Sequence, residues 1–325
     1  MTNRPDPPRG RLPDFYIVGH PKSGTTALYE MLRRHSQIFM PDLKEPRWFA
    51  PDLRARFQPS GPSTAPRLVL PETLDEYLTL FSPALPDQMV GEASPSYLRS
   101  TAAAGLIAEA QPSAKIIAVL REPAGFLRSL HLEFVQNHVE QEQDLRRAFA
   151  KEQLPPRQAG EARPPATRYS DRVRYVEQLE RYSAVFPAEQ ILVLIYDDFR
   201  RDNEGTVRKV LRFLGVDDNE PISIVEANPT VHVRSLRADR MIRSLYAGEG
   251  PVARTVKSLV RRLPGGDAVK RSIQAGRRRL LYGRPKPPDE EFMLELRRRF
   301  RGDVAALGEY LGRDLISEWG YDRLD

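Results

Sequence analysis

The sequence predicts an α/β fold in which a central, mainly parallel sheet is flanked by helices. Three apolar runs, at residues 15–18, 115–120 and 190–196, are continuous rather than alternating, as expected of strands covered on both faces. Helical patterns separate these runs, and strands that alternate with helices are typical of a doubly wound domain. A glycine-bearing turn directly follows the first run, so the chain begins its ordered part as strand, loop and helix.

The remaining elements can be placed in order along the 325 residues. Residues 1–13 carry four prolines and are expected to be a flexible lead-in. Residues 14–325 are expected to form a single domain, because no internal repeat or clear linker interrupts them. Apolar residues recur at helical spacing over 27–35, 74–81, 102–110, 126–134, 169–186, 206–214 and 292–311. Two proline-rich segments, 51–71 and 154–167, are expected to be surface loops or lids.

Composition excludes several classes of protein. The chain has no cysteine, which rules out disulfide scaffolds, thiolate nucleophiles, cysteine zinc sites and iron–sulfur clusters. The longest aliphatic runs, 116–120 and 191–195, are far shorter than the roughly 18 residues of a membrane span, so no transmembrane helix is expected. The N-terminal residues lack the apolar stretch of a signal peptide, and a cytoplasmic location is therefore expected.

Positive charge is concentrated in one region. Residues 234–286 hold 15 Lys or Arg and only three acidic residues, and the region is expected to be mainly helical. Such a region could serve a non-catalytic anion or nucleic-acid binder, or lie on an acidic membrane surface. No nucleic-acid-binding module is recognisable, and only Tyr246 and Tyr282 are available there for stacking, so a nucleic-acid partner is not expected.

The turn after the first strand has the composition of a phosphate-binding loop. Its sequence is Gly19-His20-Pro21-Lys22-Ser23-Gly24-Thr25-Thr26. Between a strand and a helix, backbone N–H groups and the positive helix end can hold a phosphate, and the lysine and hydroxyl groups add donors. A Walker A loop would place Lys after the second glycine, whereas here Lys22 precedes Gly24. A plain glycine turn with an exposed lysine is the alternative interpretation.

A second phosphate ligand is predicted at the end of the strand at 115–120. Arg121 follows this strand directly, at the sheet edge where open α/β sheets bind ligands. Its guanidinium can bind a phosphate through two hydrogen bonds, and Ser129 on the next helix can add a hydroxyl. An isolated arginine at a strand end could equally form a surface ion pair, so the combination with the first loop favours a binding site.

Taken together, these segments resemble sulfotransferases that use 3′-phosphoadenosine 5′-phosphosulfate (PAPS). Residues 21–26 resemble the family's 5′-phosphosulfate loop, and residues 116–123 with Ser129 resemble its 3′-phosphate motif. Residues 91–97 are similar to a segment of the carbohydrate (heparan-sulfate-type) branch, and residues 307–319 resemble the closing helix and tryptophan. The chain is thus identified as a member over residues 15–319, resembling bacterial proteins of that branch.

The resemblance implies a P-loop-like sulfotransferase fold and a function. PAPS would be the sulfuryl donor and 3′-phosphoadenosine 5′-phosphate the product, with no metal, and the acceptor would be a hydroxyl, less readily an amine, of a carbohydrate or small-molecule metabolite. Lys22 would stabilise the leaving phosphate. The residues implied in donor binding are Lys22, Ser23, Gly24, Thr25, Thr26, Arg121, Ser129 and Arg284. Arg284 comes from a segment resembling the family's Lys-Gly-Arg loop, in which Tyr282 takes the lysine position.

Glu45 is the implied general base. Lys44-Glu45-Pro46-Arg47-Trp48-Phe49 resembles the family's Lys-Glu-Pro-(His/any)-Phe-Phe pattern, whose Glu has that role. The alternative is a surface carboxylate paired with Lys44 or Arg47. Many cytosolic sulfotransferases use a histidine instead, and the histidines to compare with them are His20 and His138.

The segment at 91–97 departs from the pattern of its branch. Ala93 stands where relatives often carry a lysine that helps the site near the acceptor. Glu92, beside it, is left with two interpretations, an accessory role near the acceptor or a pairing role in the fold. Segments 51–71 and 135–167 are expected to frame the acceptor cleft.

A nucleotide-dependent phosphotransferase with a degenerate P-loop is the alternative enzyme. Residues 191–195, followed by Tyr196-Asp197-Asp198, could imitate a Walker B strand whose aspartate helps to hold magnesium. Against it, the lysine of the first loop is displaced and the strand before Arg121 has no acidic end.

Overall fold

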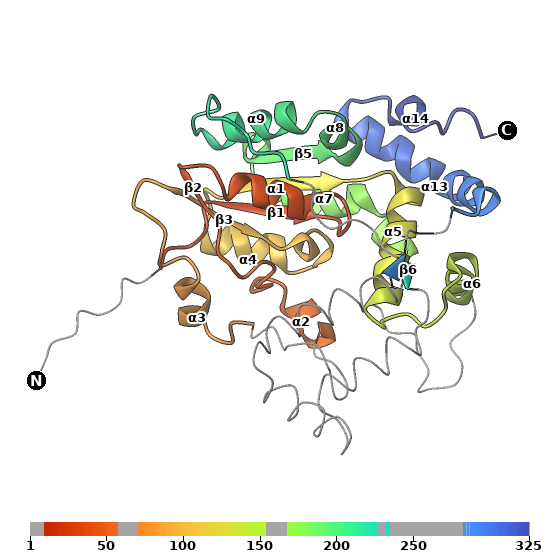
Figure 1. Cartoon of the computed structure of the whole chain (residues 1–325), viewed down its shortest axis with the longest axis horizontal. Coiled ribbons are helices and arrows are strands. Elements are labelled where there is room, and N and C mark those ends of the chain that lie inside the picture. Colours follow the sequence, from red (N-terminus) through yellow and green to blue (C-terminus); the bar gives the residue numbers. More distant parts are fainter. Residues whose placement is uncertain are drawn as a thin grey trace, which may run out of the picture.

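A five-stranded parallel sheet forms the centre of the molecule, as predicted. The computed structural model describes residues 10–57, 70–153, 168–225, 232–233, 282–283, 285 and 287–324. The strands lie in the order β2-β3-β1-β4-β5 (Figure 1). Their bounds are β1 (Phe15–Gly19), β2 (Ile38–Phe39), β3 (Met89–Ala93), β4 (Lys115–Leu120) and β5 (Ile191–Ile195).

The register brings the carboxyl ends of the strands to one edge of the sheet. Phe15 of β1 lies opposite Gly91 of β3 on one side and Lys115 of β4 on the other. Because all neighbours run parallel, the chain leaves β1, β3, β4 and β5 at the same edge. The two predicted phosphate motifs follow β1 and β4, so they leave the sheet side by side.

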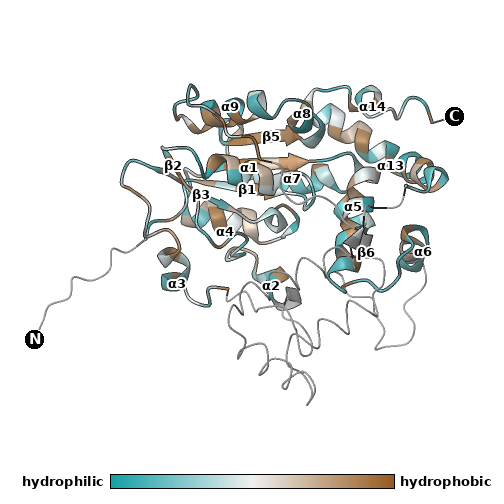
Figure 2. Cartoon of the chain, viewed as in Figure 1, coloured by the Kyte–Doolittle hydropathy of each residue, from teal (hydrophilic) through white to brown (hydrophobic). Residues whose placement is uncertain are grey.

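Helices cover both faces of the sheet, which explains the continuous apolar runs. Phe15 and Ile17 pack in one buried cluster with residues of α1 (Thr25–Leu32) and α9 (Asn203–Leu214). Tyr16 and Val18 pack in the other cluster, with residues of α4 (Ala103–Ala110), α5 (Pro123–Gln136), α7 (Tyr175–Ser183) and α13 (Glu290–Leu311). Figure 2 shows the apolar strands between helices whose outer faces are polar.

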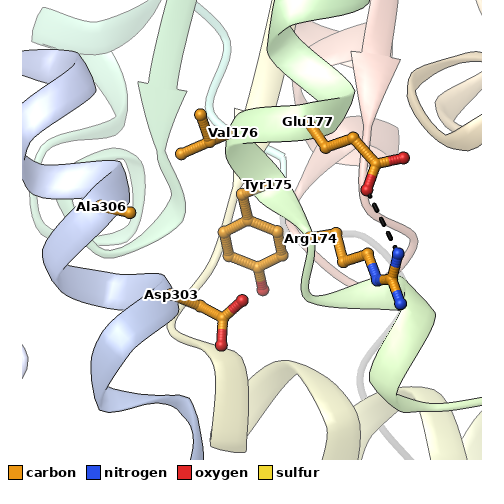
Figure 3. Close-up of a pocket in the computed structure, with 6 residues that line it drawn as sticks. All are labelled: Arg174, Tyr175, Val176, Glu177, Asp303 and Ala306. Atoms are coloured by element: carbon orange, nitrogen blue, oxygen red, sulfur yellow. Dashed lines mark hydrogen bonds and ion pairs between the residues drawn. The ribbon is translucent and has the colours of Figure 1, made fainter.

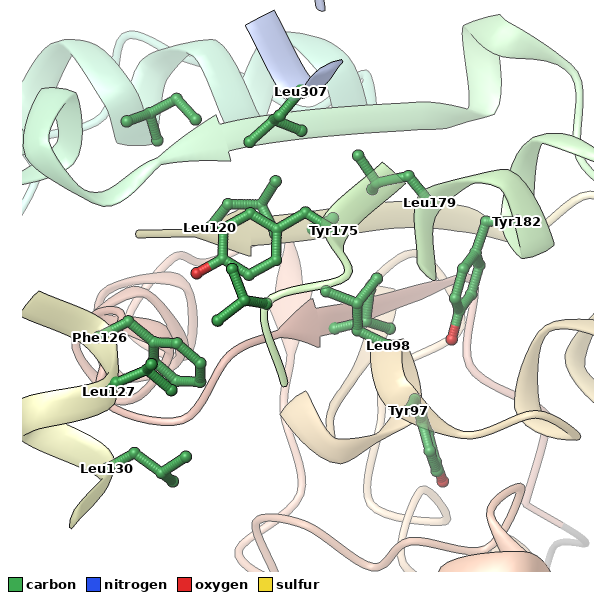
Figure 4. Packing of buried hydrophobic residues seen from close by; sticks show 14 of the residues in the cluster. Tyr97, Leu98, Leu120, Phe126, Leu127, Leu130, Tyr175, Leu179, Tyr182 and Leu307 are labelled. Carbon is green, nitrogen blue, oxygen red and sulfur yellow. The ribbon is translucent and has the colours of Figure 1, made fainter. Parts of the chain in front are cut away.

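The larger cluster joins the C-terminal helix to the sheet. Leu307 of α13 lies near Leu120 and Leu179, and Phe126 and Leu127 approach from α5 (Figure 4). Since α13 also contacts α5 and α7, burial of its apolar face secures the helix that follows β4.

Two strands of the central sheet were not predicted. β2 has only two residues, and β3 contains Gly91, a residue that is unfavourable in strands. The glycine has a packing reason, because a Cβ atom there would lie 2.2 Å from the ring of Phe15 and 2.5 Å from the sulfur of Met40. The packing of Phe15 and Met40 therefore requires a glycine at this position. Because glycine has a low strand propensity, the sequence pattern does not predict the strand.

The prediction of a loop over 51–71 was wrong for its first residues. Residues 51–57 form α2 (Pro51–Phe57), with Pro51 at the first helical position and Asp52 in the first turn, both favourable at a helix N-terminus. Residues 58–69 lie outside the described part of the chain, as do 154–167 of the second expected loop.

The predicted helix at 169–186 is shorter in the structure. A 3₁₀ turn, η4 (Ser170–Arg172), precedes α7, which begins at Tyr175. The break lies at Arg174, whose φ of −72° and ψ of 64° are not helical, and the carboxylate of Glu152 caps the preceding turn by accepting hydrogen bonds from the N–H and hydroxyl groups of Ser170.

Several short elements complete the described structure. They are α3 (Leu74–Thr79), η1 (Pro95–Arg99), α6 (Leu145–Ala150), η2 (Lys151–Gln153), η5 (Ala188–Gln190), α8 (Tyr196–Arg201), α14 (Leu315–Glu318) and an antiparallel pair, β6 (His232–Val233) with β7 (Tyr282–Gly283). None of the described helices is long and apolar enough to cross a membrane. Most of the basic region at 234–286 lies outside the described residues.

Candidate functional site

The first loop is tied to the strand beside it by two hydrogen bonds. The N–H of His20 donates to the carbonyl oxygen of Val119 at 3.0 Å, and Nη1 of Arg121 donates to the carbonyl oxygen of Lys22 at 2.8 Å. The two predicted phosphate motifs are therefore in direct contact at the carboxyl edge of the sheet.

Gly24 turns the loop into α1. Its φ of 84° is in the left-handed region, and a Cβ atom there would lie 2.9 Å from the ring of Phe199 in α8. The first turn of α1 has neither a capping side chain nor an acidic residue, so the positive end of this helix faces the loop without a counter-charge.

Ser23 is one of the buried polar residues that the fold leaves unsatisfied. Its side chain is 0% exposed, and its hydroxyl has no hydrogen-bond partner in the described part of the chain. A buried hydroxyl of this kind is costly unless it meets a ligand. Together with the helix end, Ser23 fits a phosphate-type oxygen in this loop.

Lys22 is electrostatically linked to the other site residues. Burial lowers the pKa of its ammonium group, the negative charge of Glu133 opposes this shift, and the positive charge of Arg121 adds to it. Lys22 also has a φ of 62°, a strained value for a residue with a side chain.

Arg121 lies against an aromatic ring and beside a capped helix. Its guanidinium carbon is 4.7 Å from the ring centre of Tyr196. The first amides of α5 are already occupied, because Glu122 accepts from Ala124 N–H at 3.0 Å and Gly125 N–H at 2.6 Å. An anion at this position would therefore be bound by side chains. Ser129, on the same helix, is 4% exposed.

Glu45 is held between two cations. Lys44 Nζ donates to Oε1 of Glu45 at 3.0 Å, and Arg47 Nη2 donates to Oε2 at 2.5 Å. Burial acts to raise the pKa of Glu45, but the charges of Lys44 and Arg47 outweigh it and the pKa is lowered. The carboxylate is thus ionised at neutral pH, and 30% of its side chain stays exposed. Pairing with both neighbours, the alternative considered from the sequence, is present in the structure.

Glu133 was missed by the sequence interpretation. Burial raises the pKa of its carboxyl, and the charges of Lys22, Glu45, Lys44 and Arg47 all act on it. It therefore lies within the electrostatic reach of both the loop at 20–24 and the segment at 44–49. A signal was available, because Glu133 is four residues after Ser129 and so shares its helix face.

Backbone strain marks the same residues. Among the described residues, Lys22, Glu45, Arg47 and His138 are those other than glycine that have positive φ. Three of these four belong to the loop at 19–26 and the segment at 44–49, and His138 lies in the segment expected to frame the acceptor cleft. Because strained backbone persists only where surrounding structure enforces it, this grouping supports a functional site.

His20 faces the core. It is 3% exposed and lies between Phe126 and Tyr175, with ring centres 4.5 Å and 4.4 Å away. Burial, more than any other factor, lowers the pKa of His20 to about 3. A neutral, enclosed imidazole of this kind is poorly placed to take a proton from an external acceptor.

The carboxylates after β5 are engaged with arginines. Asp198 pairs with Arg313 at 2.6 Å and with Arg201 at 3.4 Å, and Asp197 pairs with Arg200 at 3.7 Å. These contacts favour a structural role over the Walker B role of the phosphotransferase alternative. Over the described ranges, no three His, Asp or Glu side chains form a group suited to a metal ion.

A cavity lies between α7 and α13, apart from the predicted residues. It is lined by Arg174, Tyr175, Val176, Glu177, Asp303 and Ala306. Figure 3 shows the hydroxyl of Tyr175 beside Asp303 and the ion pair between Arg174 and Glu177. Tyr175 links it to the predicted site, because the hydroxyl of Tyr175 donates to the carbonyl oxygen of Arg121 at 2.9 Å.

Two predicted features lie outside the described residues. Arg284 is one, although its neighbours Tyr282 and Gly283 form β7. The segment expected to frame an acceptor cleft at 135–167 is described only to residue 153. Ala93 ends β3 with 1% exposure, and its carbonyl oxygen accepts the N–H of Glu45 at 3.1 Å.

Comparison with known proteins gives consistent matches. A model described as "Sulfotransferase family" matches residues 13–220. Carbohydrate sulfotransferase 15 of Mus musculus is 28% identical over 251 residues, 63% of this chain and 44% of that protein. The Homo sapiens bifunctional heparan sulfate N-deacetylase/N-sulfotransferase 3 is 29% identical over 209 residues, 63% of this chain and 22% of that protein.

A solved structure is also similar. The crystal structure of a sulfotransferase from Alicyclobacillus acidocaldarius matches with a TM-score of 0.58 and 32% identity, covering 71% of this chain and 90% of that chain. The chain spans less than half the length of the two curated relatives.

Proposed function

The chain belongs to the sulfotransferase family, and we propose that it transfers a sulfuryl group from PAPS to a hydroxyl group, less readily an amine, of a carbohydrate or small-molecule metabolite. The observation that carries this proposal is the hydrogen bond from Arg121 to the carbonyl oxygen of Lys22. It joins two phosphate-type motifs, as a donor with phosphates at both ends of its ribose requires.

The residues in the first loop suit the 5′-phosphosulfate end of this donor. Ser23 would donate its buried hydroxyl, and the first turn of α1 would supply backbone N–H groups to an oxygen anion. Arg121 and Ser129 would bind the 3′-phosphate, with Arg284 as a further ligand from outside the described residues. Tyr196, against which Arg121 lies, would limit the orientations open to the guanidinium.

In the proposed reaction the acceptor oxygen attacks sulfur as the bond from sulfur to the phosphate oxygen breaks. Glu45 takes the acceptor proton, because its lowered pKa keeps it ionised at neutral pH. Lys22 stabilises the negative charge that develops on the departing phosphate oxygen. Lys44 and Arg47 hold Glu45 in place but also reduce its basicity, so the acceptor must compete with them for the carboxylate.

The names of the relatives support a carbohydrate acceptor. Both curated relatives are named for carbohydrate substrates, and one of them is named an N-sulfotransferase. We therefore place a carbohydrate first among the acceptor classes.

Calorimetric titration with adenosine 3′,5′-bisphosphate tests the donor site without an acceptor. We expect micromolar binding that does not depend on magnesium, and much weaker binding of ATP with magnesium. Tight ATP binding without bisphosphate binding would instead support the phosphotransferase alternative.

Substitution of Glu45 tests the base. Once an acceptor is identified, Glu45→Gln should lower kcat while bisphosphate affinity stays near wild type, because the carboxamide cannot take the proton. Wild-type turnover in this variant, with chemistry rate-limiting, would remove Glu45 from the mechanism.

A further inference from the structure

The segment that presents Glu45 is held along its backbone by the end of β3 and the chain that follows it. Three alternate N–H groups of this segment, those of residues 45, 47 and 49, donate hydrogen bonds to it. Their acceptors are the carbonyl oxygen of Ala93 at 3.1 Å, the hydroxyl of Ser94 at 3.2 Å and the hydroxyl of Tyr97 at 3.1 Å. Positive φ at Glu45 and Arg47 means that the segment is not a regular strand and depends on these contacts to keep its shape.

The third contact continues to a buried carboxylate. The hydroxyl of Tyr97 accepts the N–H of Phe49 and donates its own proton to Oε2 of Glu92 at 2.8 Å. Because a hydroxyl has one proton, Glu92 determines which way it points and leaves a lone pair directed at Phe49. Glu92 is 0% exposed, so water does not compete for this bond.

Glu92 reaches the same segment by a second route. The hydroxyl of Tyr77 in α3 donates to the same oxygen at 2.9 Å. The ring of Tyr77 stacks on Trp48, with ring centres 5.5 Å apart and planes 16° apart. Both tyrosines that bind Glu92 therefore also contact residues within four positions of Glu45.

We propose that Glu92 is a positioning residue, which orients Tyr97 and Tyr77 so that the segment at 44–49 is fixed against the end of β3 and Glu45 is presented to the acceptor. This rests on the proposed function of Glu45 as the base. A carboxyl group buried in an apolar cluster is destabilising compared with an apolar side chain of similar size, so stability alone gives no reason for it here.

A glutamine should replace Glu92 with little effect. Burial raises the pKa of Glu92 to about 7, against the opposing effect of its hydrogen bonds, so at neutral pH a large share of the carboxyl groups is already uncharged. The carbonyl oxygen of glutamine can accept both tyrosine protons, whereas leucine accepts neither. Glu92→Gln is therefore the conservative variant and Glu92→Leu the disruptive one.

The fluorescence of Trp48 reports the position of the segment without any acceptor. The chain has two tryptophans, and replacing the buried Trp319 by Phe leaves Trp48 as the single tryptophan. In this background, loss of one buried hydrogen bond should raise the population of the detached segment about fivefold. We expect the acrylamide quenching constant to rise about twofold in Tyr97→Phe and in Glu92→Leu.

Two variants serve as controls. Glu92→Gln should keep the quenching of the Trp319→Phe background. Tyr182→Phe should do the same, because it removes another fully buried tyrosine hydroxyl that has no hydrogen-bond partner among the described residues. Bisphosphate affinity should stay within about twofold in all variants, because the donor residues lie on other loops.

The outcomes separate positioning from a general structural role. Wild-type quenching in folded Tyr97→Phe would overturn the proposal, and this variant decides the matter if Glu92→Leu does not fold. Loss of bisphosphate binding together with increased quenching would also overturn it, because Glu92 would then support the whole fold. Failure of the wild type to bind bisphosphate would count against the proposed donor and leave the quenching result unaffected.

With an acceptor in hand, kinetics provide a further readout. Tyr97→Phe should lower kcat about tenfold with the KM for PAPS nearly unchanged, and Glu92→Gln should restore kcat relative to Glu92→Leu. Equal kcat in the two Glu92 variants would contradict a positioning role.

Discussion

Nη1 of Arg121 donates a hydrogen bond to the carbonyl oxygen of Lys22 at 2.8 Å, across 99 positions of sequence. The side chain that follows β4 therefore holds the backbone of the loop that follows β1. Any ligand bound by Arg121 is placed next to that loop, and loss of the guanidinium affects both.

Arg121→Ala should weaken adenosine 3′,5′-bisphosphate binding by about tenfold to a hundredfold, because it removes a charge-assisted contact and releases the carbonyl of Lys22. Arg121→Lys should recover only part of the affinity, since an ammonium group cannot make the paired hydrogen bonds of a guanidinium. Calorimetry measures both variants, with Arg208→Ala on α9 as the matched loss of a surface arginine. Wild-type affinity in Arg121→Ala would exclude Arg121 from the donor site.

Gly24→Ala should abolish bisphosphate binding while the chain stays folded. The new Cβ atom would lie 2.9 Å from Phe199, and the φ of 84° is unfavourable for alanine, so the loop must move. Gly105→Ala is the matched control, because Gly105 lies in α4 with nothing within 4 Å of its added Cβ. Calorimetry and circular dichroism measure binding and folding, and unchanged binding in Gly24→Ala would contradict a donor site in this loop.

Bisphosphate binding should be lost as the pH rises, and in Glu133→Gln this loss should begin at a lower pH than in the wild type. Burial lowers the pKa of Lys22 and the charge of Glu133 raises it, so removing that charge lowers the pKa of Lys22 further. Lys22 would then lose its proton, and with it its attraction for phosphate, at a lower pH. Titrations at a series of pH values measure this, with Glu109→Gln as a control on the exposed side of α4. If binding were lost at the same alkaline pH in Glu133→Gln and in the wild type, Lys22 and Glu133 would not be coupled.

His20 should make the protein less stable in mild acid. The pKa of His20 is about 3 in the folded protein and 6.5 in the unfolded chain. Below pH 6.5 the unfolded chain therefore binds a proton that the folded protein does not. Between pH 7.5 and 5 this costs about 2 kcal/mol of the free energy of unfolding. Denaturant unfolding of the wild type and of His20→Phe at pH 7.5 and pH 5 isolates the contribution of His20 to the free energy of unfolding. The other histidines contribute equally in the two proteins. Equal pH dependence in the two proteins would refute the burial of a neutral His20.

The site could be predicted from the sequence where it depends on neighbours along the chain. The loop at 19–26 can be predicted because a glycine turn, a lysine and hydroxyl residues lie between an apolar run and a helical pattern. Arg121 can be predicted because it directly follows a strand. Glu133 cannot, because its role depends on the loop at 20–24 and the segment at 44–49 lying near its helix face.

The sequence by itself determined the α/β class, β4 at its observed bounds and the glycine turn between β1 and α1, because periodicity and turn chemistry are local properties, whereas the segment containing Glu45 was singled out through its resemblance to the family pattern. Tertiary structure alone decided that Arg121 binds the backbone of Lys22, that His20 is enclosed by Phe126 and Tyr175, and that Glu92 reaches the segment of Glu45 through two tyrosines. The physical reason is that hydrogen bonds and burial between distant segments arise only when parallel strands bring their ends to one edge of the sheet.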